Sequence, residues 1–227
     1  MTRVDHLLVS VTDLREAQER WERTGLAATI GGSHPGGTSN ALIRGPRRAY
    51  LELITASTDA TSEAGRRVLT TQGPVSWALG VTEIEAVRAA VRESGVESGP
   101  VSDGSREKPD GEVLRWRICD LAPTVLHPFI PFLIEWEAEM PPGPAEGPVL
   151  TALTVECPDP RWLSSVLELC GLPLDEAHNR DFTHDDGEVT IRVSEGKGGL
   201  RTAEFALPDG PFTEVELDGL LVHRVRR

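Results

Sequence analysis

The sequence predicts an α+β fold made of repeated βαβββ modules. The apolar run Val4–Val11 is typical of a strand. Asp13 and Glu16 follow it with the spacing of a capping box, at the start of a helix that Gly25 ends. The same order of strand, helix and strands returns twice further along the chain, which indicates an internal repeat.

The first module is expected over residues 1–56. After its helix, a Gly-rich loop over 31–37 separates two of three further strands. These strands are predicted at 27–30, 40–44 and 49–54.

The second module is expected over residues 73–137 and completes a paired domain, 1–138. Thr82 is predicted to cap its helix, which Gly95 ends. Its strands are predicted at 74–81, 96–101, 113–119 and 132–136.

A Pro-rich linker over 139–148 separates this domain from a third, degenerate module over 149–227. Four prolines in this stretch, at positions 141, 142, 144 and 148, exclude a continuous helix or a central strand. Residues 150–172 then align with 4–26 without a gap, and Asp159 and Gly171 fall on the cap and stop positions of the first helix.

Composition excludes several classes of partner. The net charge of −13 disfavours binding to nucleic acid or an anionic membrane. No apolar run reaches the length of a spanning helix, and the first residues have no secretory pattern, so a cytoplasmic protein is expected. The three cysteines, Cys119, Cys157 and Cys170, form no CxxC pair and are expected to be buried apolar residues.

Several motifs together resemble the glyoxalase-like branch of the vicinal oxygen chelate superfamily. The motifs are Val-Asp-His-Leu at 4–7, the Gly-rich stretch 31–40, Tyr-Leu-Glu-Leu at 50–53 and Pro-Phe-Leu-Ile-Glu-Trp at 131–136. The resemblance implies that paired modules curl into a cupped, barrel-like mixed sheet with helices outside and a small-molecule site inside. It also implies that metal-using members take a His from the first strand of a module and a Glu from its last strand.

Alternation of side chains along a strand tests this implication. In the first strand, Leu7 and Val9 are expected to pack on the helix, which turns His6 into the cup. In the last strand of the module, Leu51 and Leu53 are also expected to pack on the helix, which turns Glu52 into the cup. His6 and Glu52 are therefore predicted to lie on the same wall.

The later modules lack a first-strand histidine. In the second module, Glu135 matches Glu52 and is predicted to face the cup, while Phe132, Ile134 and Trp136 face the helix. Arg117 is expected to reach the cup and bind substrate, and a buried arginine needs a carboxylate such as Glu135. The third module has Ala152 in place of His6, so it is interpreted as a structural or dimer-forming half.

The candidate metal ligands are His6, Glu52 and Glu135, with His34 as a further possibility. Such a set suits Zn²⁺, Mn²⁺, Fe²⁺ or Ni²⁺, and Glu52 or Glu135 could also transfer a proton as the catalytic group. His34, Thr38 and Asn40 belong to the Gly-rich stretch and are predicted to bind substrate. The tryptophans are expected to anchor helices to sheets: Trp21, Trp77, Trp116, Trp136 and Trp162.

Three functions remain open from the sequence. The first is a metal-dependent lyase, isomerase or dioxygenase acting on a small oxygenated organic molecule. The second is a metal-free pocket that sequesters a small molecule, as in drug-binding members of the superfamily. The third is a structural or regulatory domain, with the third module forming a homodimer.

Overall fold

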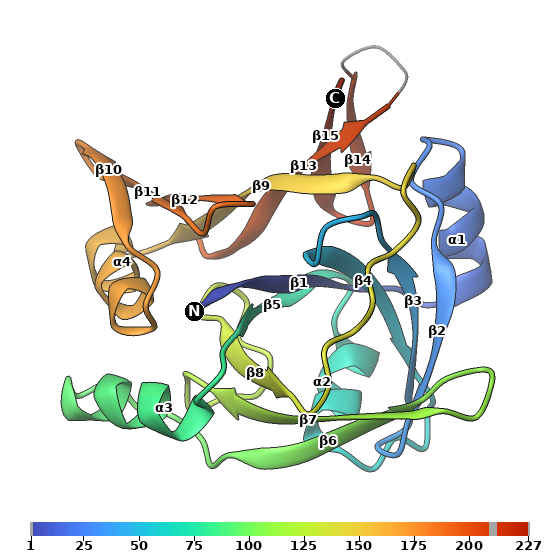
Figure 1. The fold of residues 1–227 in the computed structure, drawn as a ribbon, viewed down its shortest axis with the longest axis horizontal. Helices are drawn as coiled ribbons and strands as arrows, with labels where there is room; N and C mark the ends of the chain where they lie inside the picture. The colour runs from blue at the N-terminus through green and yellow to red at the C-terminus, as the bar shows by residue number, and fades with distance from the viewer. Residues whose placement is uncertain (1, 209–212, 227) are drawn as a thin grey trace.

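The computed structural model describes residues 2–208 and 213–226, and these form two packed sheets. Figure 1 shows an eight-stranded closed barrel in the lower half of the view and an open seven-stranded sheet above it. The α+β class and the cupped sheet predicted from the sequence are confirmed.

The barrel contains all the strands of the first two modules. Each module contributes four neighbouring strands, and the two sets join at β1–β5 and at β2–β6. Around the barrel the order is β1 (Arg3–Ser10), β4 (Tyr50–Ala56), β3 (Thr38–Ile43), β2 (Thr29–His34), β6 (Ser102–Glu107), β7 (Val113–Asp120), β8 (Phe132–Trp136) and β5 (Gly73–Gly80).

The helices are short, and they lie outside the sheets except for the second, whose Val68 packs among the inward-facing residues of the barrel. They are α1 (Leu14–Glu22), α2 (Glu63–Thr70), α3 (Ile84–Glu93) and α4 (Pro160–Leu169). Asp13 caps α1 as predicted, because its side chain accepts a hydrogen bond from the backbone N–H of Glu16. In the described part of the chain, no helix is long and apolar enough to cross a membrane.

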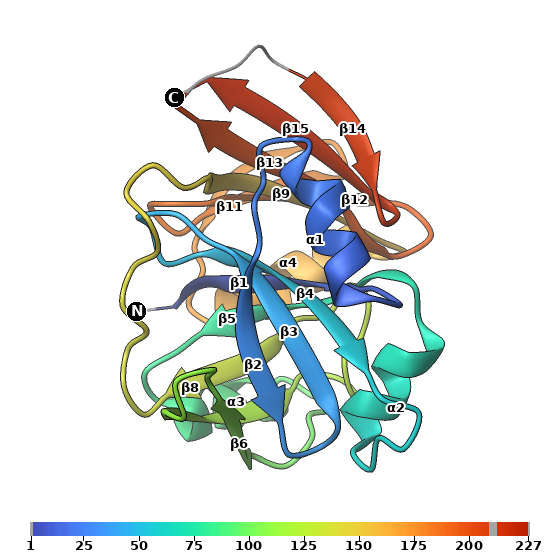
Figure 2. The ribbon, with the colours of Figure 1, turned by 90° about the vertical axis from the view of Figure 1, so that its right-hand side faces the viewer.

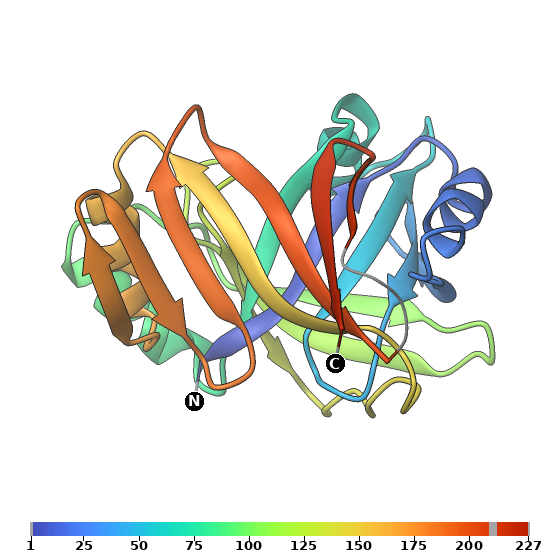
Figure 3. The ribbon, with the colours of Figure 1, turned by 90° about the horizontal axis from the view of Figure 1, so that it is seen from above.

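The second sheet contains all the strands of the third module. Its order is β10 (Leu174–His178), β11 (Asp181–Asp185), β12 (Thr190–Glu195), β9 (Val149–Cys157), β13 (Gly199–Leu207), β15 (Leu220–Arg226) and β14 (Thr213–Leu217). Figure 3 looks onto its outer face.

This sheet covers one side of the barrel. Figure 2 shows the open sheet above the barrel. Strand β13 contacts β5 and β9 contacts β4, and one apolar core includes residues of both sheets. Trp21 of α1 also donates a hydrogen bond to Asp218, in the turn between β14 and β15, at 2.7 Å. The division into domains 1–138 and 149–227 stays a prediction.

Three predictions of local structure are wrong. Strand β6 lies at Ser102–Glu107 and not at 96–101. The sequence does not predict this strand, because its residues are polar and lack the apolar pattern that marks a strand. Strand β2 continues to His34, through half of the predicted Gly-rich loop. Helix α3 begins after Glu83 and not Thr82, and Glu83 makes no side-chain cap.

Candidate functional site

The barrel encloses a cavity of about 300 Å³. Strands from both modules contribute to its wall. The polar side chains that line it are His6, His34, Thr38, Tyr50, Glu52, Ser62, Asp103, Ser105, Arg106 and Asp120.

His6 and Glu52 come from two neighbouring parallel strands, β1 and β4. In the register of the pair, Leu8 lies opposite Glu52 and Tyr50 lies opposite His6. Leu7, Val9, Leu51 and Leu53 belong to the outer core, so the alternation turns His6 and Glu52 into the cavity as predicted. His6 Nε2 lies 3.6 Å from Glu52 Oε2, and both side chains are buried.

A β-bulge places Asp5 beside His6. Val4 pairs with Leu79 and His6 pairs with Ala78, so Asp5 has no partner on β5. A bulge of this kind re-aims the extra side chain. Asp5 Oδ1 lies 2.6 Å from His6 Nδ1, and Asp5 Oδ2 accepts a hydrogen bond from Trp136 Nε1 at 3.0 Å.

Asn40 holds the other oxygen of Glu52. Its Nδ2 donates to Glu52 Oε1 at 2.9 Å, and both side chains are buried. The side-chain amide of Asn40 lies close against Gly31. A Cβ at position 31 would collide with Asn40 Oδ1, so only glycine leaves room for this amide. Asn40 therefore acts on the site through Glu52.

His34 and Thr38 face each other across the hairpin of β2 and β3. His34 Nδ1 lies 2.7 Å from Thr38 Oγ1, and both residues line the cavity. Burial lowers the pKa of His34 below its ordinary value of 6.5, although the carboxylate of Glu52 acts in the opposite direction. His34 is therefore a neutral imidazole at pH 7.

Aromatic rings form much of the remaining wall. His6 stacks on Tyr50 at 4.9 Å and meets Phe132 edge-on at 5.6 Å. Trp116 and Trp136 lie 5.0 Å apart, and both line the cavity. Burial raises the pKa of Tyr50 well above its ordinary value of 10, so its hydroxyl is neutral.

The prediction that all five tryptophans anchor helices is wrong for these two. Only Trp21 and Trp77 are fully buried in the core, and Trp162 is exposed. Trp116 extends over Gly104 of β6, where a Cβ would collide with the indole nitrogen. Gly104 pairs directly with Trp116, and because glycine has no side chain, the indole ring of Trp116 fits inside the barrel.

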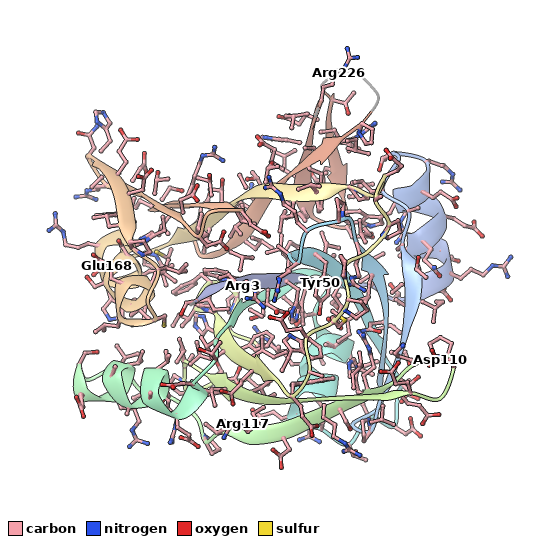
Figure 4. The ribbon with its side chains drawn as sticks, in the orientation of Figure 1. Arg3, Tyr50, Asp110, Arg117, Glu168 and Arg226 are labelled. Atoms are coloured by element: carbon pink, nitrogen blue, oxygen red, sulfur yellow. The ribbon has the colours of Figure 1, made fainter. Side chains whose placement is uncertain are left out.

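The inward direction predicted for Glu135 and Arg117 is wrong. Phe132, Ile134 and Trp136 of β8 line the cavity, which turns Glu135 to the outside. There Glu135 pairs with Arg117, directly opposite on β7, with Arg117 Nε 2.7 Å from Glu135 Oε2. Figure 4 labels Tyr50 inside the barrel and Arg117 at its lower edge.

Glu135 has a structural role at the start of α3. Its Oε1 accepts a hydrogen bond from the backbone N–H of Ile84 at 3.3 Å. This contact supplies the N-terminal cap that Thr82 and Glu83 do not provide. Neither Glu135 nor Arg117 lines the cavity that contains His6 and Glu52.

The donor set for a metal ion is limited to two close groups. His6 Nε2 and Glu52 Oε2 are separated by about the distance between two ligands that each lie about 2.0–2.2 Å from one ion. Asp5 occupies the position of the outer carboxylate that orients a metal-binding histidine. Residues 2–208 and 213–226 contain no cluster of three or more His, Cys, Asp or Glu side chains that could hold a metal.

The sequence matches the glyoxalase-like domain family across residues 4–169. The chain therefore belongs to the glyoxalase-like family of the vicinal oxygen chelate superfamily. No curated protein matches it in sequence.

Solved structures share the fold at low sequence identity. A hypothetical protein from Staphylococcus aureus has a TM-score of 0.78 at 15% identity, with 100% of both chains covered. An Mn(II)-bound glyoxalase from Novosphingobium aromaticivorans has a TM-score of 0.61 at 10% identity, over 99% of this chain and 82% of that chain. A mutant 4-hydroxymandelate synthase from Streptomyces coelicolor has a TM-score of 0.58 at 13% identity, over 92% of this chain and 71% of that chain.

Replacing Glu135 with Ala is expected to destabilise the protein without changing the cavity. Loss of the helix cap and of a partly exposed ion pair should lower the free energy of unfolding by about 1–2 kcal/mol. Urea unfolding measures the change, and Glu137→Ala, an exposed residue just beyond β8, is the matched control. Equal stability of the two variants would contradict the assigned role.

His34 is expected to titrate below pH 6.5. Because its pKa is lowered in the folded state, the unfolded chain binds the proton more readily, and the free energy of unfolding falls as pH drops below 6.5. NMR of the histidine ring nitrogens, assigned with His34→Gln, measures the midpoint. A midpoint above 6.5 would show that burial does not control this residue.

Proposed function

We propose that this chain is a metal-dependent enzyme of the lyase, isomerase or dioxygenase type. Its substrate is a small oxygenated organic molecule bound in the barrel cavity. The observation that carries the proposal is the approach of His6 Nε2 to Glu52 Oε2 at 3.6 Å inside a cavity that has room for a ligand.

The polarity of the pair supports a cation between them. The carboxylate of Asp5 only accepts hydrogen bonds, so His6 Nδ1 donates to it. His6 Nε2 then faces Glu52 Oε2, and a lone pair on this nitrogen opposite a carboxylate requires a proton or a metal ion between them. An imidazole nitrogen and a carboxylate oxygen that are buried and face each other are suited to bind Zn²⁺, Mn²⁺, Fe²⁺ or Ni²⁺.

In this proposal His6 and Glu52 would hold the ion as its two protein ligands. When bound, the ion acts as a Lewis acid that polarises an oxygen of the substrate. Asp5 fixes the ring of His6, and Asn40 fixes the rotamer of Glu52. A bound substrate would displace water from the cavity, which strengthens electrostatic interactions there.

His34 is the candidate for proton transfer beside this pair. Its ring is neutral, its Nδ1 is engaged by Thr38, and it lines the same cavity as Glu52. A neutral imidazole can accept a proton from a bound molecule. Thr38 then serves as a positioning residue for His34.

A metal-free binding protein is the second candidate. It is favoured by the small donor set, because a catalytic metal ion commonly has three protein ligands. The aromatic wall would suffice to bind a small organic molecule. Binding of a ligand that survives excess EDTA, in a protein without metal, would favour this alternative.

Elemental analysis of protein purified without a chelator tests the enzyme proposal. The wild type is expected to contain, or to take up on reconstitution, roughly one divalent ion per chain. His6→Ala and Glu52→Ala should lose it, because each removes a ligand. Asp5→Asn should weaken metal binding by about 10- to 100-fold, because it removes the orienting carboxylate.

Glu135→Ala is the matched control, since its carboxylate lies outside the barrel and its metal content should equal that of the wild type. Circular dichroism checks that each variant is folded. A low metal content in the wild type that does not rise on reconstitution would exclude the proposal.

A further inference from the structure

Arg106 is a buried cation in the wall of the cavity. It lies on β6, where it pairs with Leu114 of β7, and only 3% of its surface is exposed. It lines the same cavity as His6 and Glu52. The unexpected position of β6 places this guanidinium inside the barrel.

The guanidinium of Arg106 has few partners. One terminal nitrogen lies 3.4 Å from the sulfur of Met140, which is a weak acceptor. Its Nε has no hydrogen-bond partner, and no carboxylate among the described residues lies within ion-pair distance. A buried charge without a partner is costly, so this arrangement calls for an anion that the chain itself does not supply.

Three carboxylates line the cavity, Glu52, Asp103 and Asp120, and Asp5 lies behind His6. Asp120 accepts a hydrogen bond from the backbone N–H of Leu126, and Asp103 is exposed. Asp5 contacts His6 and Trp136, and Glu52 contacts Asn40. Neither carboxylate is therefore available to Arg106.

We propose that Arg106 recognises the carboxylate of a small organic acid bound in the cavity. The guanidinium presents parallel N–H donors that match a carboxylate. A single arginine in a cavity that is also lined by Glu52, Asp103 and Asp120 suits a monoanion better than a phosphate dianion. The aromatic wall accommodates an apolar or aromatic body, and about 300 Å³ limits its size.

This inference deepens the proposed function, because it names the substrate class of the same cavity. It rests on that function only in taking the cavity as the ligand site. Recognition of the carboxylate by Arg106 requires neither metal nor turnover, so the two claims can fail separately.

Calorimetric titration in the presence of EDTA tests the inference with benzoate and its neutral analogue benzamide. The wild type is expected to bind benzoate at least about 10-fold more tightly than benzamide. Arg106→Met should lose this preference by weakening benzoate binding alone. Arg115→Met, which removes an exposed arginine of β7, should retain it.

Two further measurements separate recognition from folding and from catalysis. Thermal unfolding without ligand should show Arg106→Met to be at least as stable as the wild type, because it removes an unpaired buried charge. Glu52→Gln should keep the preference for benzoate even if the metal proposal fails. Inorganic phosphate should bind at least about 10-fold more weakly than benzoate.

Three outcomes would overturn the inference. They are no preference of the wild type for benzoate over benzamide, retention of that preference by Arg106→Met, and a clear loss of thermal stability or failure to fold in Arg106→Met. The last outcome would assign Arg106 a structural role.

Discussion

The site depends on the burial of a carboxylate, Glu52, inside the barrel. A charged group in such a place is stable only when its neighbours compensate it. The chain meets this requirement with Asn40 on one oxygen and His6 near the other, and a β-bulge then turns Asp5 onto the far side of the imidazole. The geometry proposed for a metal site thus follows from the compensation of one buried charge.

The sequence predicts this half of the site because β1 and β4 alternate clearly. Leu7, Val9, Leu51 and Leu53 identify the outer face, so the inward direction of His6 and Glu52 follows from strand geometry alone. Asp5 could not be found in this way, because a bulge breaks the alternation at one residue and leaves no mark in the pattern of apolar residues.

The other half of the site escapes sequence reasoning for two physical reasons. Strand β8 has apolar residues on both faces: Leu133 packs in the outer core, and Phe132 and Ile134 pack inside the barrel, so its pattern does not identify the inner side. The inward direction that the sequence predicts for Glu135 is wrong for this reason. Strand β6 is polar and resembles a loop, which concealed Arg106.

The central claim is that His6 and Glu52 hold a divalent ion. Crystals of the protein soaked with Mn²⁺ test it directly through anomalous diffraction. The account predicts one strong anomalous peak in the barrel, about 2.0–2.2 Å from both His6 Nε2 and Glu52 Oε2. A cavity without such a peak after saturating soaks, or a peak bound only by other residues, would contradict it.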